Sequence, residues 1–216
     1  MKDYLIKRQK ETIPRYGLLR RTRAVMQQLE QFITSRPYTM LDIGTADGLM
    51  LDRLKEKYKV NCFGLDYDLR YLKSAQKRGL VVIQADGKKL PLCDNSFDIV
   101  ISTAVFKHIS GLEYLVAECH RVIKPSGKSV VIDPTPLGIY LGRLLGHFSK
   151  REIAQVLSLG ATQKILVEGG FKIITAERFM LTPFPFIGSE GLEKKLKQIH
   201  LTMLFFDYII YAECIN

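Results

Sequence analysis

The stretch "MLDIGTADG", residues 40–48, joins a short apolar run, an aspartate and a loop of small residues. Gly44 opens this loop and Gly48 closes it. Glycine lets a backbone take positive φ angles and approach a ligand closely. Ala46 stands at the centre of the loop, where a nucleotide-binding loop often has a glycine. The stretch predicts either a cofactor loop with one substitution or an ordinary strand-to-helix turn.

Three acidic residues, Asp42, Asp66 and Asp86, lie at or near the ends of three successive apolar stretches. If these stretches are parallel strands, their carboxyl ends meet at one edge of the sheet, where open α/β sheets bind ligands. One acidic strand end usually caps a helix. Three in succession, with Gly44 and Gly48 beside the first, favour a ligand site.

The residue types at this edge limit the ligand. A dinucleotide loop needs G-x-G-x-x-G, which "GTADG" does not supply, and "ADGKKL" lacks the first glycine and the Ser/Thr of a phosphate-binding loop. An acidic loop would also repel pyrophosphate. Carboxylates accept hydrogen bonds from hydroxyls and amines. S-adenosylmethionine fits, since it offers a ribose diol, an exocyclic amine and a positive charge.

Hydrophobic periodicity and turn residues predict the elements that position these groups. Expected helices cover residues 17–34, 48–58, 68–79 and 112–123, with a less regular helical region at 136–168. Expected strands cover 38–44, 60–66, 80–86, part of 90–105, 128–134, 171–181 and 203–214, and a loop with a short helix fills 182–201. This alternation predicts a single α/β domain whose parallel sheet is covered on both faces.

The composition is that of an ordinary globular chain, with 216 residues, 47% hydrophobic and 25% charged. The tract "MLFFDYIIYA" is interrupted by Asp207 and too short to span a bilayer, and no secretion signal is recognised at the N-terminus. The cysteines form no CxxC pair, so neither a zinc nor an iron–sulfur site is expected. Free thiols in a reducing cytoplasm are the expectation for Cys62, Cys93, Cys119 and Cys214.

Positive charge is concentrated near the N-terminus. The net charge is +10, and the first 23 residues carry eight Lys or Arg against two acidic residues. A basic arm can meet RNA, an anionic surface or an acidic substrate. A solvated helix face is the alternative interpretation.

Four motifs carry a resemblance to a known family. "LDIGTADG" resembles the first motif of class I S-adenosylmethionine-dependent methyltransferases, and "FGLDYDLRYL" resembles their second, an acid that ends strand two. "ADGKKLPLCDNSFDIVIS" and "RVIKPSGKSVVIDP" are similar to the family's stretches at strands four and five. The resemblance covers roughly residues 38–134 and is closest to the small-molecule subgroup of ubiquinone and menaquinone biosynthesis. It indicates a cofactor loop at residues 40–48.

The family's fold is a Rossmann-like, mostly parallel seven-stranded sheet with helices on both faces and an antiparallel last strand. The resemblance implies one domain over 1–216, divided into an N-terminal helical cover, 1–36, and a sheet core, 37–216. The cover is expected to act as a mobile lid, with Tyr16 and Arg20 closing over an acceptor. A helix packed permanently on the sheet is the alternative.

The resemblance also implies roles for single residues. Asp42 would orient the amino group of S-adenosylmethionine, Asp66 would accept the ribose hydroxyls, and Asp86 would read the adenine amine. The other expected cofactor-binding positions are Gly44, Thr45, Ala46, Gly48, Tyr67, Gly87 and Thr103, the last of these near the sulfonium.

Two residues depart from the family pattern. Ala46 replaces the central glycine of the first motif, which adds a methyl group and a conformational cost if φ is positive. Ser126 replaces the first glycine of "PGG", at a turn away from the cofactor, where little consequence is expected.

The acceptor is less defined than the cofactor. His108 in "VFKHI" is the candidate catalytic residue, with a role in shaping the pocket wall as the alternative. No Asn/Asp-Pro-Pro-Tyr motif follows strand four, "DPTP" at 133–136 follows strand five, and no nucleophilic cysteine motif is present. An apolar acceptor site or simply core is expected from Phe184, Phe186, Ile187, Leu204, Phe205 and Phe206.

Three functions stay open at this point. The leading one is methyl transfer from S-adenosylmethionine to a small-molecule or lipid-like acceptor, with S-adenosylhomocysteine as product and no metal. The alternatives are an RNA-directed methyltransferase that uses the basic N-terminal arm and a non-catalytic S-adenosylmethionine-binding protein. The sequence indicates neither the acceptor nor the oligomeric state.

Overall fold

The computed structural model describes residues 12–34, 37–144, 153–180, 189–198, 201 and 205–215. The expected lining residues Phe184, Phe186, Ile187 and Leu204 lie outside these ranges, as do residues 1–11. No helix in the described part of the chain is long and apolar enough to cross a membrane.

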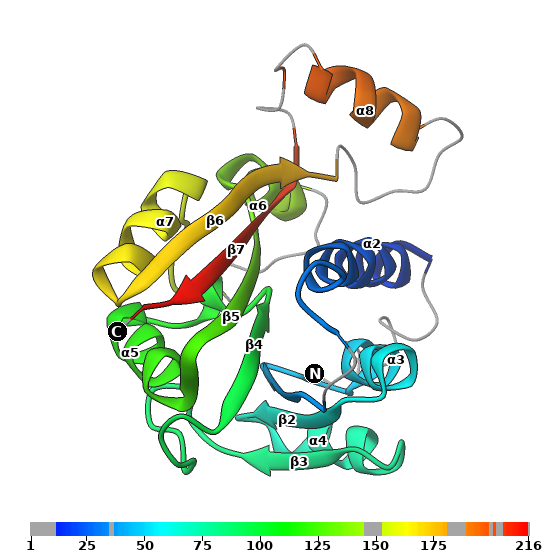
Figure 1. Ribbon diagram of the computed structural model, residues 1–216. Coiled ribbons are helices and arrows are strands. Elements are labelled where there is room, and N and C mark those ends of the chain that lie inside the picture. Colours follow the sequence, from blue (N-terminus) through cyan, green and yellow to red (C-terminus); the bar gives the residue numbers. More distant parts are fainter. Residues whose placement is uncertain are drawn as a thin grey trace.

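A seven-stranded sheet runs through the centre of the molecule in the order β3-β2-β1-β4-β5-β7-β6 (Figure 1). The strands β1 to β5 are mutually parallel, and β7 pairs antiparallel with both β5 and β6. Their bounds are β1 Thr39–Ile43, β2 Asn61–Asp66, β3 Val81–Gln84, β4 Phe97–Thr103, β5 Ile123–Pro134, β6 Phe171–Phe179 and β7 Asp207–Cys214. The expected architecture, including the antiparallel last strand, is confirmed.

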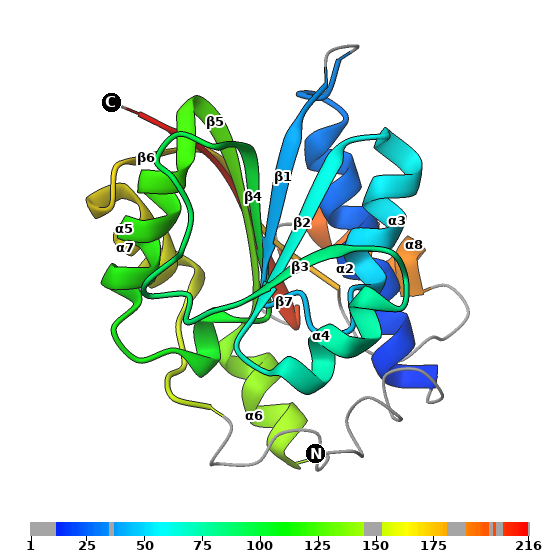
Figure 2. The same cartoon turned by 90° about the horizontal axis from the view of Figure 1, so that it is seen from below.

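Helices cover both faces of the sheet (Figure 2). Their bounds are α2 Thr12–Leu29, α3 Leu49–Tyr58, α4 Leu69–Gln76, α5 Leu112–Val122, α6 Pro136–Leu144, α7 Leu159–Glu168 and α8 Ser189–Gln198, with a short 3-10 helix, η1, at Phe106–His108. One buried cluster joins α2, α3 and α4 to the sheet, and a second joins α5 and α7 to its other face. The strands β1, β4 and β7 and most of β5 are buried, which explains why they are almost continuously apolar in sequence.

Local sequence explains where several elements begin and end. The Asp68 side chain accepts the N–H of Arg70 and caps α4, as expected. Gly79 has φ +73° just beyond that helix, in the left-handed region that glycine tolerates. The strand expected at 128–134 begins earlier, at Ile123, because Ile123 already pairs with Phe97 before the "KPSG" turn.

The helix α2 packs on the sheet and is part of the core. Val25 and Leu29 are fully buried in the cluster that contains Met40 and Leu51. The Arg21 guanidinium donates to both carboxylate oxygens of Asp207, at 2.7 and 3.1 Å. In this structure residues 12–29 are packed on the sheet, as the packed-helix alternative describes. The lid expected from residues 1–36 stays a prediction.

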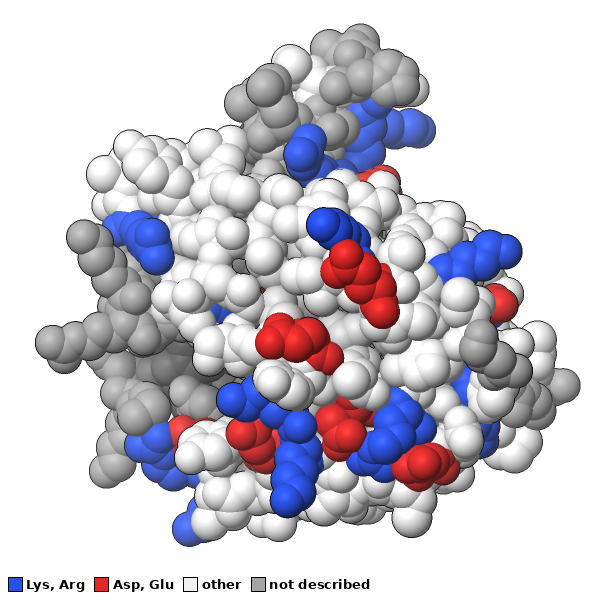
Figure 3. All heavy atoms as spheres, turned by 90° about the vertical axis from the view of Figure 1, so that its left-hand side faces the viewer, with Lys and Arg blue, Asp and Glu red and all other residues white. Residues whose placement is uncertain are grey.

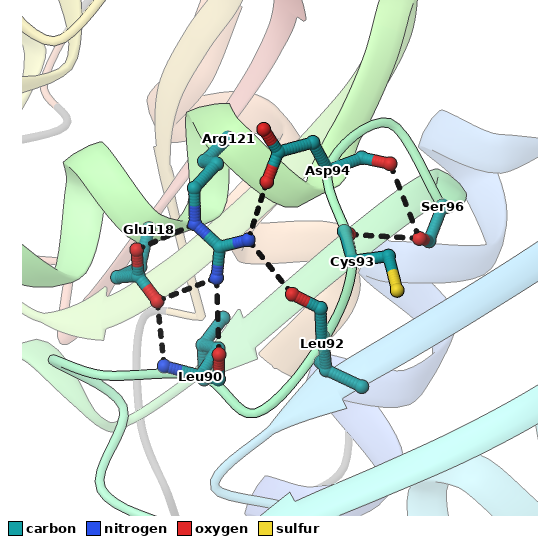
Figure 4. Close-up of polar contacts among 7 residues, drawn as sticks. All are labelled: Leu90, Leu92, Cys93, Asp94, Ser96, Glu118 and Arg121. Carbon is teal, nitrogen blue, oxygen red and sulfur yellow. Dashed lines mark hydrogen bonds and ion pairs between the residues drawn. The ribbon is translucent and has the colours of Figure 1, made fainter.

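The segment between β3 and β4 is fastened to α5 by the side chains of Arg121 and Glu118, whose Oε2 accepts the Leu90 N–H at 2.6 Å (Figure 4). The Arg121 guanidinium donates to the carbonyl oxygens of Leu90 and Leu92, at 3.0 and 2.7 Å. It also pairs with Glu118 and Asp94, at 2.7 and 2.6 Å. These contacts fix the path that the chain takes from the carboxyl end of β3 to the start of β4.

Candidate functional site

The glycine loop leaves β1 at the carboxyl edge of the sheet. The N–H groups of Gly44 and Thr45 both donate to the carbonyl of Leu65, at 2.7 and 2.9 Å, which fastens the loop to β2. Three residues of the loop have positive φ: Gly44 at +76°, Ala46 at +51° and Gly48 at +75°. The conformational cost expected for alanine at position 46 is therefore present in the structure.

Gly44 is required for a second reason besides its φ. A Cβ on Gly44 would lie 2.2 Å from Cγ2 of Val105, in the loop that follows β4. The cofactor loop and the post-β4 loop thus touch each other directly. A larger residue at position 44 would force the two loops apart.

Asp66 joins the first loop to the end of β2. Its Oδ2 accepts the N–H of Ala46 at 2.9 Å, and its Oδ1 accepts the N–H of Asp68 at 2.9 Å. The side chain is only partly buried. The carboxylate thus lies at the carboxyl edge of the sheet, and carboxylates accept hydrogen bonds from hydroxyl groups. This placement fits a ribose diol.

Asp86 and Gly87 follow β3 at the same edge. The Asp86 side chain is exposed, and its Oδ1 accepts the N–H of Lys88 at 2.9 Å. Gly87 is buried against Leu115 and Ile43, where a Cβ would meet their side chains at 3.0 and 3.7 Å. Asp86 is thus held at the rim, with further acceptor capacity for an amine.

Tyr67 lies directly after Asp66. Its side chain is 78% exposed. The Tyr67 carbonyl accepts from the side-chain amide of Gln84 at 3.2 Å. The expected role of Tyr67 against the cofactor remains a prediction.

Buried hydroxyl groups border the loop at the ends of β1 and β4. The Oγ1 of Thr45 and the Oγ of Ser102 are buried and find no hydrogen-bond partner among the described residues. Asp42 is also buried, at 2% exposure. Buried polar atoms of this kind are normally satisfied, and a polar ligand would be one way to satisfy the two hydroxyls.

Thr103 ends β4 and is half-buried. Its hydroxyl lies 3.9 Å from the sulfur of Met50 in α3. The position is at the carboxyl edge, as expected, but the described contact is to the protein core.

His108 ends the short helix η1, and its side chain is exposed. Its backbone N–H donates to the carbonyl of Val105 at 2.8 Å. The histidine is therefore carried by the same loop that touches Gly44. A role in the acceptor site stays a prediction.

A buried acid–base pair near this loop was not among the expected site residues. Asp133, 2% exposed, lies one residue before the end of β5, and Lys107, 6% exposed, lies in η1. Their Oδ1 and Nζ atoms are 3.9 Å apart. Burial raises the pKa of Asp133 to about 6, although Lys107 lowers it. The sequence offered a signal for Asp133, because it is a fourth acidic residue at the end of an expected strand.

The residues present fit S-adenosylmethionine at this edge. Asp66 holds its carboxylate at the end of β2, and Asp86 lies where the next strand ends. The N–H groups of Gly44 and Thr45 donate to the Leu65 carbonyl and hold the loop at this edge. The expected binding positions thus come from the ends of adjacent strands, although the contacts themselves remain a prediction.

Comparison with known proteins agrees with the fold and the motif order. Residues 41–131 match the family model described as a methyltransferase domain. The chain is 34% identical over 97 residues to a malonyl-[acyl-carrier protein] O-methyltransferase of Coxiella burnetii, covering 44% of this chain and 33% of the relative. It is 32% identical over 150 residues to a demethylmenaquinone methyltransferase of Thermus thermophilus, covering 60% of this chain and 66% of the relative. The chain therefore spans between a third and two thirds of the length of these relatives.

A solved structure extends the agreement to the whole fold. A chain from the complex between the Haloferax volcanii Trm112 methyltransferase activator and a methyltransferase superposes with a TM-score of 0.73. The match covers 99% of this chain and 96% of the other at 18% identity, a level that speaks for the fold alone. Together with the four motifs and the sheet order, these similarities show that the chain belongs to the class I S-adenosylmethionine-dependent methyltransferases.

Proposed function

We propose that this protein transfers a methyl group from S-adenosylmethionine to a small-molecule or lipid-like acceptor. The observation that carries the proposal is the placement of Asp66. Its carboxylate is fixed by the N–H groups of Ala46 and Asp68 at the carboxyl end of β2, beside the Gly44 loop. The relatives named above are a malonyl-[acyl-carrier protein] O-methyltransferase and a demethylmenaquinone methyltransferase, which supports an acceptor outside nucleic acid.

The chemistry asks little of the protein beyond alignment. The bound cofactor supplies an electrophilic methyl group on a positively charged sulfur. The chain's own residues would hold the acceptor atom in line with that methyl and exclude water, which can provide much of the acceleration. A proton acceptor is needed only if the acceptor atom carries a proton, and His108 is the residue proposed for that role.

One face of the molecule gives no support to the RNA-directed alternative. The face shown in Figure 3 carries acidic and basic side chains interspersed, and its described part forms no continuous basic patch.

All four cysteines are free, which supports a reducing compartment such as the cytoplasm.

Calorimetric titration with S-adenosylhomocysteine tests the cofactor site. We expect binding by the wild type, no binding of NAD, and a loss of about 1–3 kcal/mol of binding free energy in Asp66→Ala, the scale for hydrogen bonds to a charged group. Asp68→Ala is the matched control, since it removes an acidic group two residues away that caps α4. Equal affinity of Asp66→Ala and wild type would remove Asp66 from the site.

The acceptor step needs a second experiment. Mass spectrometry of small molecules that copurify with the protein, followed by methyl transfer to that compound and to a short-chain demethylmenaquinone, tests acceptor class. His108→Ala should keep the affinity for S-adenosylhomocysteine, since His108 lies on the loop after β4. Cofactor binding without transfer to any tested acceptor would contradict the proposed activity and favour a binding protein.

A further inference from the structure

Asp133 holds the loop after β4 at two points. Its Oδ2 accepts the backbone N–H of Phe106 at 2.9 Å, and its Oδ1 faces Lys107 Nζ at 3.9 Å. Both side chains are almost completely buried. A buried carboxylate is costly unless it is paired, so the facing ammonium matters to this arrangement.

Lys107 links Asp133 to the start of the loop. Its Nζ donates to the carbonyl oxygen of Ala104 at 2.5 Å. Ala104 has φ +61°, the turn by which the chain leaves β4. The carboxylate of Asp133 is thus connected to Ala104, Phe106 and Lys107, which together span most of the loop.

The opposite side of the loop faces the cofactor site. Val105 packs so closely on Gly44 that only a glycine fits there. From the other direction, the N–H groups of Ala154 and Gln155 donate to the Lys107 carbonyl, at 2.8 and 3.2 Å. The loop therefore lies between the cofactor loop and segment 153–158, and Asp133 is its anchor in the sheet.

We propose that Asp133, acting through Lys107 and the Phe106 N–H, is a positioning residue that sets the post-β4 loop against the Gly44 loop and so aligns the acceptor with the transferred methyl. The kinetic part of this inference rests on the proposed function. The structural part, an anchored loop, does not.

The pairing of the Asp133 carboxylate with the Lys107 ammonium depends on pH. The charged or titratable groups that face it are Lys107 from η1, Arg21 from α2, and Asp207 and Tyr208 from β7. Lys107 and Arg21 lower the pKa of Asp133, while Asp207 raises it, and burial outweighs them all. With a pKa of about 6, Asp133 is mostly ionised at pH 7 and mostly neutral at pH 5. Only the ionised form pairs with the Lys107 ammonium.

Hydrogen exchange without any acceptor tests the anchor. Asp133→Asn keeps an oxygen for the Phe106 N–H but removes the charge that faces Lys107. Asp98→Asn is the matched control, since Asp98 is also a buried aspartate, accepts the Thr39 N–H at 2.9 Å and lies 3.0 Å from Lys124 Nζ at the start of β4. Protection of residues 104–108 is measured at pH 5 and pH 7, corrected for intrinsic exchange, in protein without cofactor.

At pH 7, where Asp133 is mostly ionised, we expect residues 104–108 to be less protected in Asp133→Asn than in wild type and Asp98→Asn, because the variant lacks the charge that faces Lys107. Equal protection of this loop in Asp133→Asn and wild type at both pH values would overturn the proposal. If Asp133→Asn does not fold, Lys107→Met takes its place, and Lys107→Arg should restore protection because it keeps the positive charge.

Kinetics with a short-chain demethylmenaquinone give the second readout. Asp133→Asn should lower kcat/KM for this acceptor by roughly 10- to 100-fold, the scale of a small misalignment, with affinity for S-adenosylhomocysteine unchanged. Asp98→Asn should leave kcat/KM unchanged. A pH profile of kcat/KM that rises through about pH 6 in wild type and is flat in Asp133→Asn supports positioning over general stabilisation. Absence of transfer by the wild type would contradict the proposed function, while the exchange result still decides the anchor.

Discussion

Several non-glycine residues have backbone angles that suit glycine better. Ala46, Ala104 and Ser126 all have φ between +51° and +63°. Ala46 and Ala104 lie in the two loops that meet at Gly44, so their backbone angles contribute to the shape of the site. Ser126 lies at the turn before the main part of β5, with an exposed side chain. The strain at Ser126 can thus be relieved without touching the site.

Ser126→Gly should stabilise the protein by about 0.5–1 kcal/mol, because glycine accepts the left-handed region that serine resists. Urea unfolding measures the change, and affinity for S-adenosylhomocysteine should not alter. Asn95→Gly is the matched control, since Asn95 is exposed at φ +53° and asparagine tolerates this region. A gain no larger in Ser126→Gly than in Asn95→Gly would show that φ at Ser126 stores little strain.

Single elements are tied to the site through a few long side chains. The helix α2 holds β7 through Arg21 and Asp207 and reaches α8 through Arg20, whose Nη2 lies 2.6 Å from Glu193. Arg20 also donates to the Tyr16 hydroxyl at 3.0 Å. Tyr16 and Arg20, expected to close over an acceptor, are thus engaged with each other and with α8.

Hydrogen exchange separates a structural α2 from a lid. Residues 18–29 should exchange slowly both with and without S-adenosylhomocysteine, because Val25 and Leu29 are fully buried in the core. Exchange in the exposed part of α4 serves as the internal reference. Fast exchange in α2 that slows when the cofactor product binds would restore the lid interpretation for this helix.

The Arg121 side chain fastens the segment between β3 and β4 to α5. Glu118 and Asp94 raise the pKa of its guanidinium, so the charge is always present. Arg121→Lys keeps the charge but loses the planar fork that reaches two carbonyls and two carboxylates. We expect a loss of about 1–3 kcal/mol in the free energy of unfolding.

The matched control for this clamp is Arg70→Lys. Arg70 also pairs with an aspartate, Asp68, but its side chain is 60% exposed, and exposed ion pairs contribute little to stability. Thermal or urea unfolding of the two variants makes the comparison. Similar losses in both would mean that Arg121 is not the fastening of this segment.

At the scale of the whole molecule, stability depends on pH through two opposing groups of carboxyls. Asp98 and Glu118 have lowered pKa values because basic side chains and backbone N–H groups stabilise their charge. Their contribution is present above the ordinary pKa and lost as pH falls. Asp133 has a raised pKa, so its contribution is present below its ordinary pKa and lost as pH rises through about 6.

Asp133→Asn should therefore change the pH dependence of unfolding in one window. Between pH 7 and pH 5 the wild type should gain roughly 1 kcal/mol relative to Asp133→Asn, since protonation of a buried carboxyl favours the folded state. Urea unfolding gives the free energy of unfolding of both proteins at both pH values. Comparing the change between pH 7 and pH 5 in the two proteins cancels any effect of the substitution that does not depend on pH. A variant with the same pH dependence as wild type would show that Asp133 titrates at its ordinary pKa.

The sequence by itself determined the order and type of the elements. Strands buried on both faces must be apolar throughout, and surface helices must carry an apolar stripe, so both left a periodic pattern from 38–44 to 203–214. The positions of the motif residues were also predictable from local sequence. Asp42, Asp66 and Asp86 each follow their own strand, and a parallel sheet brings such ends to one edge.

Only the tertiary structure decided which groups meet across long separations. The contact of Gly44 with Val105, the pairing of Asp133 with Lys107 and the ion pair of Arg21 with Asp207 each join residues far apart in the chain. No local pattern encodes such pairs, because they depend on strand order and on how deeply each helix packs. For the same reason, the basic residues within 1–23 left a surface arm and a solvated helix face both open, and only the structure shows where Val25 and Leu29 of α2 are buried.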